Sequence, residues 1–263
     1  MTTQSLLARG RAGETLADLD IVDMHGHVGA YDFAIPGRTP EAMVAAMDRI
    51  GVRQILCSHM ACITGQVETG NREMLEAMRA CPGRILGYAT VWPESAEAVE
   101  AETRHCLDAG FTGVKLHNAN GFPYDDPAYA PALALANERR RPVLFHTWGQ
   151  PAEMAQVRRL SARYPSAALL LGHSGMNHPE EYVQIARECA NVYLEICGSV
   201  WPRGTLERLV EGAGVERVVW GSDAYFMSQA HQLGKVLGAT CDDAVKRQVL
   251  STNARRILNA ILP

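Results

Sequence analysis

Two histidines stand two residues apart in the segment DMHGH at positions 23–27, and this spacing could let both bind one metal ion. On a β-strand, alternate side chains point to the same face, so the imidazoles of His25 and His27 would lie side by side. Neutral imidazoles are common ligands of divalent metal ions, although such a pair can also be two core histidines satisfied by backbone carbonyls. The remainder of the sequence favours the metal site.

Three further polar residues each follow a short apolar run. His146 ends PVLFH, His173 ends ALLLGH and Asp223 ends VVWGSD. The carboxyl ends of the strands in an α/β barrel meet at one rim, which carries the active site. We therefore predict that His25, His27, His146 and Asp223 converge on one cation, with His173 beside them.

Three imidazoles and a carboxylate suit Zn²⁺, which is the expected ion, and they also suit Mn²⁺, Co²⁺ or Fe²⁺. A divalent ion that keeps one position open for water is catalytic, because it lowers the pKa of that water to roughly 7. Asp223 would then accept the proton of the water and pass it to the leaving group. The alternative role of Asp223 is a helix cap in the sequence GSDAYF.

Lys115 lies in the run TGVKLH, on the same face as His117. A lysine amine buried near cations is costly unless it is neutral or modified. Three interpretations stay open at this point. Lys115 could be carboxylated and bridge two metal ions, it could hold a substrate carboxylate as an ammonium, or it could form a salt bridge to Asp223 or Glu195.

Several residues near the ends of these runs are candidates for substrate contact. His117 ends the fourth run, and Trp148 and Tyr225 directly follow the fifth and eighth runs. Trp148 and Tyr225 could wall a pocket for a planar or apolar substrate, or they could pack loops over the barrel. Arg38 suggests an acidic substrate and is equally well explained as a surface charge. Glu195 could orient a ligand histidine from behind.

These residues need a scaffold, and eight short apolar runs could supply it. The runs begin near positions 21, 53, 84, 112, 142, 167, 191 and 217. None alternates between apolar and polar residues, as expected of parallel strands buried on both faces. Amphipathic stretches separate the runs, and the first has a cap at Thr39, a first-turn proline at Pro40 and a stop at Gly51. Eight such repeats predict a (β/α)₈ TIM barrel.

The whole chain is expected to hold one barrel domain. Its 263 residues match the length of one α/β barrel, for which roughly 250 residues is typical. We expect residues 1–18 to be a loosely ordered N-terminal extension and residues 19–263 to form the barrel. The last helical region, from about Asp242, is expected to cover one end or side of that barrel.

Composition excludes several other classes. A net charge of −4 argues against nucleic acid and anionic membranes as partners. No apolar run approaches the roughly 20 residues of a membrane helix, and the amino terminus does not resemble a signal peptide. Seven cysteines without a C-x-x-C pair fit a reducing cytoplasm and are interpreted as small core residues. We expect a cytoplasmic enzyme with a small-molecule substrate, and a homodimer is possible because such barrels often pair.

Together, these motifs resemble the amidohydrolase superfamily. The resemblance rests on DMHGH, His146, HSG at 173–175 and GSD at 221–223, and the closing STNARRIL resembles the C-terminal motif of the amidohydrolase-2 branch. It implies that His25, His27, His146 and Asp223 are metal ligands. It also implies that His173 is a ligand of a second ion or polarises the substrate and water.

The segment VKLHNAN at 114–120 resembles dihydroorotase-like members, in which the lysine is carboxylated. This resemblance implies that Lys115 bridges two metal ions. Many members of the amidohydrolase-2 branch hold a single ion, however, so one ion and two ions are both retained.

Three functions are consistent with these residues. The leading expectation is hydrolysis of an amide, lactone or ester bond through metal-activated water, because the chain is short for the decarboxylases of the branch. The alternative is metal-dependent decarboxylation or hydration of an unsaturated or aromatic carboxylic acid. The third is an inactive ligand-binding barrel, which is disfavoured because no ligand position is missing.

Overall fold

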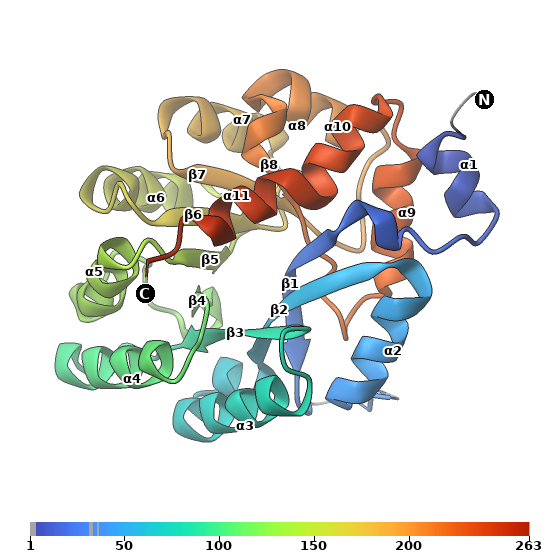
Figure 1. Ribbon diagram of the computed structural model, residues 1–263. Helices are drawn as coiled ribbons and strands as arrows, with labels where there is room; N and C mark the ends of the chain where they lie inside the picture. Colours follow the sequence, from blue (N-terminus) through green and yellow to red (C-terminus); the bar gives the residue numbers. More distant parts are fainter. Residues whose placement is uncertain (1–3, 32–33, 36, 263) are drawn as a thin grey trace.

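A barrel of parallel strands forms the centre of the protein, as seen in a computed structural model that describes residues 4–31, 34–35 and 37–262 (Figure 1). The strands pair in chain order, each parallel to the next. They are β1 (Ile21–Val28), β2 (Val52–His59), β3 (Ile85–Thr90), β4 (Gly113–Leu116), β5 (Pro142–His146), β6 (Ala168–Gly172), β7 (Val192–Ile196) and β8 (Val218–Trp220).

The barrel closes where β8 meets β1. Gly26 and Ala224 form a parallel bridge, and the backbone N–H of Asp223 donates to the carbonyl of His25 at 2.7 Å. The N–H of His27 in turn donates to the carbonyl of Ala224. The predicted (β/α)₈ TIM barrel is therefore confirmed, and its closing seam runs through the histidine pair.

Helices surround the strands. They are α2 (Pro40–Ile50), α3 (Val67–Ala80), α4 (Ala96–Asp108), α5 (Ala130–Glu138), α6 (Pro151–Arg163), α7 (Pro179–Glu188), α8 (Thr205–Ala213) and α9 (Gln229–Gly238). α2 has the predicted ends, because Thr39 Oγ1 accepts from the N–H of Ala42 at 3.2 Å and Gly51 adopts φ +86°. Within the described residues, no helix is both long and apolar enough to cross a bilayer.

The chain's last helices cover the end of the barrel at which the strands begin. α10 (Asp243–Arg247) continues through a π-helical turn, η6 (Gln248–Thr252), into α11 (Asn253–Asn259). Asn253 Nδ2 donates to the carbonyls of Val215 and Val218, both at 2.7 Å. Ala254 and Ile257 pack with Val22, Met24 and other inward side chains of the strands. The expectation that this region covers one end of the barrel is confirmed.

The N-terminal segment differs from the loosely ordered extension expected for residues 1–18. Its described part contains α1 (Leu6–Arg11), and the side chains of Leu6 and Leu16 are buried in the core between strands and helices. The N–H of Leu6 donates to Asp243 Oδ2 at 2.8 Å. Two leucines in a short polar stretch are enough to dock this segment, because they bury apolar surface in the core where α1 contacts α9.

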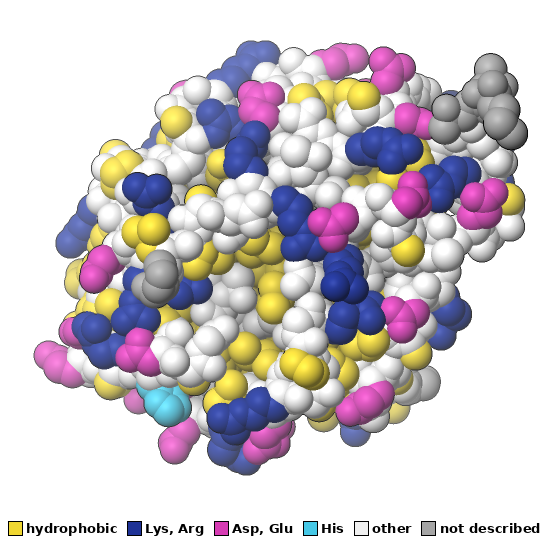
Figure 2. All heavy atoms as spheres, in the orientation of Figure 1, with side chains coloured by type: hydrophobic (Ala, Val, Ile, Leu, Met, Phe, Trp, Pro, Cys, Tyr) yellow, Lys and Arg dark blue, Asp and Glu magenta, His cyan; other side chains and the backbone are white. Residues whose placement is uncertain are grey.

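The face on which α10 and α11 lie mixes both signs of charge. In Figure 2, Lys and Arg side chains are interspersed with Asp and Glu, and hydrophobic side chains show between them. This face therefore has no extended patch of positive or negative charge.

Candidate metal centre

The histidine pair of β1 lies in the barrel mouth with Asp223. Both imidazoles are buried, and their ring centroids are 5.3 Å apart. Asp223 Oδ1 lies 3.1 Å from His27 Nε2 and 3.7 Å from His25 Nε2. The possible ligand atoms of these three residues all lie within 4.8 Å of one another. Two nitrogens and one oxygen at this spacing are a donor set that fits a divalent metal ion.

The outer nitrogens of both histidines are already held. His25 Nδ1 lies 2.7 Å from Glu195 Oε2, and His27 Nδ1 lies 3.1 Å from Ser58 Oγ. A histidine that ligates metal through one nitrogen usually donates from the other to a carboxylate, a backbone carbonyl or water. Glu195 therefore has the orienting position expected for it, and Nε2 of each imidazole is directed toward Asp223.

A buried carboxylate, Asp23, fixes the end of β8 that carries Asp223. Its oxygens accept from Ser222 N at 2.9 Å, Ser222 Oγ at 2.5 Å, Gln229 Nε2 at 3.0 Å and His25 N at 3.2 Å. Burial raises the pKa of Asp23 to about 6, although these hydrogen bonds act in the opposite direction. The role of Asp23 was missed in the sequence, where the only signal was an acidic residue inside an apolar strand.

Lys115 reaches the same centre from β4. Its Nζ is buried and lies 3.1 Å from His25 Nε2. Burial lowers the pKa of Lys115 to about 8, while the charge of Asp223 acts to raise it. An ammonium and a metal ion would compete for the same lone pair on His25, so an ion at this nitrogen requires Lys115 to lose its proton, move or become carboxylated.

His146 and His173 form a second group beside the first. His173 Nε2 lies 3.1 Å from His146 Nδ1, and the rings of His173 and His25 are 5.2 Å apart. His146 also packs against His117, with ring centroids 4.1 Å apart. The structure thus brings all the predicted ligands to one rim. His146, however, lies outside the three-residue group of His25, His27 and Asp223.

Four imidazoles of this rim, those of His25, His117, His146 and His173, are held neutral. Burial lowers the pKa of His25, His117 and His146 well below the usual value, and neighbouring positive charges act in the same direction. Burial also lowers the pKa of His173, to about 4, against the opposing effect of Asp223. Neutral imidazoles keep the lone pair that a metal ion needs at pH 7.

Asp223 and His173 both occupy the left-handed backbone region, with φ +58° and φ +64°. Residues other than glycine are uncommon there, and the conformation costs on the order of 1–3 kcal/mol. Each residue directly follows a strand or lies a few residues beyond it, so the turn directs its side chain back over the barrel mouth.

A pocket of about 270 Å³ opens above these residues. Its walls are largely aromatic and sulfur-containing, and its floor is polar. The lining residues are His27, Tyr31, Met60, Ile63, His117, Ala119, His146, Trp148, His173, Met176, Ser199, Asp223, Phe226 and Met227. A larger hollow of about 460 Å³ lies beside α3 and α4, but four of the histidines and Asp223 line the smaller one.

Two of the predicted substrate contacts line this pocket and two do not. His117 and Trp148 are in its wall, and Trp148 stacks on His173 at 5.6 Å. Tyr225 instead donates from its hydroxyl to the carbonyl of Thr39 and lines a neighbouring hollow. Arg38 is exposed and is not among the described residues that line the pocket. Phe226, the aromatic residue directly after Tyr225, lines the pocket instead.

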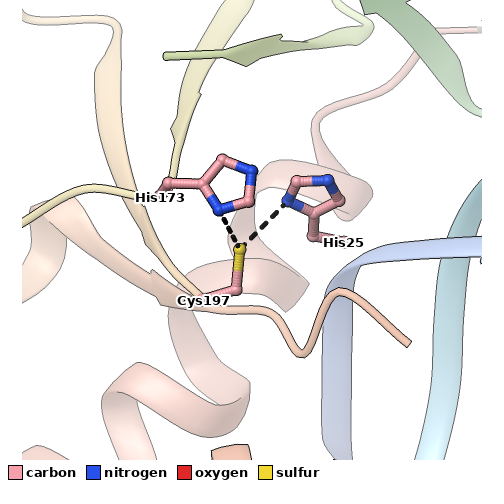
Figure 3. A group of neighbouring side chains, drawn as sticks. All are labelled: His25, His173 and Cys197. Atoms are coloured by element: carbon pink, nitrogen blue, oxygen red, sulfur yellow. Dashed lines mark hydrogen bonds between the residues drawn. The ribbon is translucent and has the colours of Figure 1, made fainter. Parts of the chain in front are cut away.

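One side chain of the centre was missed entirely. Cys197 Sγ lies 3.2 Å from His173 Nδ1 and 3.4 Å from His25 Nδ1 (Figure 3). It also lies 3.2 Å from Glu195 Oε2. Burial raises the pKa of the Cys197 thiol well above its usual value, and burial likewise raises the pKa of Glu195 to about 8. The spacing of Glu195 and Cys197, two apart on a strand, was the available signal.

Solved structures with the same fold include enzymes and an uncharacterized protein. 5-Carboxyvanillate decarboxylase from Sphingomonas paucimobilis is 17% identical, with a TM-score of 0.70 over 92% of this chain and 99% of that chain. Dihydroxybenzoic acid decarboxylase from Polaromonas, with bound manganese and the inhibitor 2-nitroresorcinol, is 17% identical, with a TM-score of 0.70 over 91% and 96%. An uncharacterized TIM-barrel protein from Bordetella bronchiseptica is 17% identical, with a TM-score of 0.74 over 91% and 98%.

The comparison with curated proteins found no match. At the identities above, the solved structures establish the fold alone. Family membership rests on a separate comparison that spans most of the chain. Residues 22–260 match the amidohydrolase-2 family model, described as amidohydrolase, and the chain therefore belongs to this family.

Proposed function

We propose that this protein is a metal-dependent enzyme that decarboxylates a small planar carboxylic acid. The observation that carries the proposal is the buried group of His25, His27 and Asp223, of which His27 and Asp223 line the floor of a pocket with aromatic walls. Such a pocket suits a flat ring whose acidic group points down to the donor atoms.

His25 Nε2, His27 Nε2 and Asp223 Oδ1 would hold the metal ion, and we propose His146 as the fourth ligand. When bound, the ion supplies positive charge that holds and polarises the substrate carboxylate. Nitrogen and oxygen donors accept several divalent ions. Since a decarboxylase of the same fold carries manganese, Mn²⁺ should be tested beside the expected Zn²⁺.

The remaining residues position the substrate and move a proton. Trp148 and Phe226 would stack against the ring and exclude water from the floor of the pocket. As the bond between ring and carboxylate breaks and carbon dioxide leaves, the ring carbon must gain a proton. Asp223 is proposed to take that proton from solvent and pass it to the ring carbon, and His173 to orient the acidic group of the substrate.

Chain length no longer favours hydrolysis over decarboxylation. The match to 5-carboxyvanillate decarboxylase spans 99% of that chain, so this protein is not too short for the fold of such an enzyme. The aromatic pocket then becomes the feature that separates the two reactions.

Hydrolysis of an ester, lactone or amide is retained as a second candidate because of one observation. Burial acts to raise the pKa of Asp223, but a hydrogen bond from His27 and the charges of neighbouring residues outweigh it and lower the pKa. An ionised Asp223 suits the removal of a proton from water, which hydrolysis requires. The third function, an inactive ligand-binding barrel, would be supported only if the protein turned over neither class of substrate.

The test uses metal-loaded protein and two substrate panels. Hydroxylated benzoic acids and unsaturated acids are assayed for released carbon dioxide, and aryl esters, lactones and amides are assayed for incorporation of ¹⁸O from labelled water. Carbon dioxide release from the first panel is expected. Incorporation of ¹⁸O without carbon dioxide release would replace decarboxylation by hydrolysis.

Two further assignments belong to this proposal. Elemental analysis with the mass of the Lys115 peptide would distinguish one ion with unmodified lysine from two ions with carboxylated lysine. A cytoplasmic location and a homodimer stay predictions, which fractionation and light scattering would test.

A further inference from the structure

Cys197 links the two groups of histidines described above. Its Sγ lies within 3.2 Å of both His173 Nδ1 and Glu195 Oε2, and Glu195 Oε2 is also the partner of His25 Nδ1 at 2.7 Å. His173 continues the chain through Nε2 to His146 Nδ1 at 3.1 Å. One connected line of hydrogen bonds thus runs from His146 at the pocket to the buried carboxyl group of Glu195. Figure 3 shows the part of it in which Cys197 lies between His173 and His25.

The direction in which these groups donate their hydrogen bonds decides which nitrogen of each imidazole carries the proton. A neutral imidazole has one donor nitrogen and one acceptor nitrogen, and the partner of the first fixes the second. For His146 to offer a lone pair at Nε2, its Nδ1–H must donate to His173 Nε2. His173 then carries its own proton on Nδ1 and donates to Cys197 Sγ, and the thiol donates to Glu195.

If every hydrogen bond is donated in the opposite direction, His146 offers a donor at the pocket instead of a lone pair. If the thiol donated to His173 Nδ1, His173 would donate from Nε2 to His146 Nδ1. His146 would then carry its proton on Nε2 and have no lone pair there for a metal ion. The two arrangements differ in whether the Cys197 thiol accepts a hydrogen bond from His173 or donates one to it. A thiol can accept and donate at the same time, so Cys197 can accept from His173 while it donates to Glu195.

We propose that Cys197 is a positioning residue that sets the tautomers of His173 and His146, so that His146 presents Nε2 as a ligand atom. The proposal rests on the proposed metal site, since it assigns His146 to that site. It gives the buried thiol a function other than filling space.

The chain offers a graded set of variants for the test. Cys197→Ser keeps a group that both donates and accepts, whereas Cys197→Ala removes it. Cys189→Ala is the matched control, because Cys189 is also buried but packs in the core between strands and helices. Far-UV circular dichroism and thermal unfolding establish that each variant is folded.

The first readout is the tautomer of each histidine, measured by long-range ¹H–¹⁵N correlation on metal-free protein with ¹⁵N-labelled histidine. Wild type, Cys197→Ser and Cys189→Ala are expected to hold His173 and His146 with the proton on Nδ1. Cys197→Ala is expected to lose this preference at both residues. A proton on Nε2 of His173 in the wild type would overturn the proposal.

The second readout is the affinity for Zn²⁺ and Mn²⁺, measured by competition with a chelator. Because Cys197 acts behind a ligand, Cys197→Ala is expected to weaken binding roughly 10- to 100-fold. Cys197→Ser is expected to stay close to the wild type. Equal affinity in Cys197→Ala and wild type, or equal loss in the serine and alanine variants, would contradict the assigned role.

Two outcomes separate this inference from the hypothesis that Cys197 binds the metal ion and from the proposed function itself. A sulfur-to-metal charge-transfer band in the Co²⁺-loaded wild type would make Cys197 a ligand and overturn its role as a positioning residue. Failure of the wild type to bind any ion would defeat the proposed function, whereas the tautomers in wild type and Cys197→Ala would still be measured and would decide the inference.

Discussion

The two ends of the barrel are filled by side chains of opposite polarity. At the end where the strands begin, Ala254 and Ile257 of α11 pack against apolar side chains such as Val22 and Met24. At the end where the strands finish, the buried space holds imidazoles, carboxylates, a lysine and a thiol. The first end buries apolar surface and stabilises the fold, and the second places polar groups where burial costs free energy. Stability and chemistry are therefore expected to respond to different mutations.

The largest expected effect falls on activity at the polar end. Asp223→Asn removes the proposed proton carrier, and kcat/KM should fall by about 10²- to 10⁴-fold. The free energy of unfolding, measured in urea, should change far less. Asp18→Asn at an exposed position is the matched control. Wild-type turnover in Asp223→Asn would remove this residue from the mechanism.

The reciprocal effect belongs to the apolar end. Ile257→Ala should lower the free energy of unfolding by about 2–5 kcal/mol, because it leaves a cavity beneath the barrel. The activity of the remaining folded protein should stay near the wild-type level. Urea denaturation and kcat, measured under conditions where the variant is folded, test both statements. A large loss of kcat would show that the two ends are coupled.

A smaller effect is expected from the carboxylate behind His25. Glu195→Gln replaces the 2.7 Å partner of His25 Nδ1 by an amide of the same shape. Affinity for the metal ion should fall roughly 10- to 100-fold, since such outer partners tune the ligand. Competition with a chelator measures it, with Glu188→Gln on the exposed end of α7 as the control. An unchanged affinity would remove Glu195 from the centre.

The smallest effect is a pH dependence of stability in the metal-free protein. Folding lowers the pKa of His173 to about 4 from 6.5, so the unfolded chain binds the proton more readily in that interval. The stabilisation is complete above pH 6.5 and is lost as the pH falls toward 4, by at most about 1.4 kcal/mol per pH unit for this group. Urea denaturation between these values should show the slope, and His173→Asn should reduce it. A flat profile would contradict the neutral, buried imidazole.

The polar end could be predicted from sequence where a single strand determines the geometry. His25 and His27 share a face because strand side chains alternate, and His146 and Asp223 reach the same rim because each lies at or just beyond a strand's carboxyl end. These statements need only the period of a strand and the topology of a barrel.

Other parts of the site depend on distances between strands or on single turns. Asp23 and Cys197 gain their roles from contacts across β1, β6, β7 and β8, and the local pattern of each residue gives no distance to those partners. Tyr225 is predicted to line the pocket because it is aromatic and follows β8, but its hydroxyl donates to the carbonyl of Thr39 and Phe226 lines the pocket instead. Leu6 and Leu16 bury a segment whose composition predicts a loose end.

Metal content measured together with activity tests the central claim most directly. The account predicts at least one divalent ion per chain, loss of activity after exhaustive chelation, and recovery when Zn²⁺ or Mn²⁺ is restored. His27→Ala should bind the ion far more weakly. Purified protein that turns over its substrate at the full rate with no divalent ion present would contradict the account.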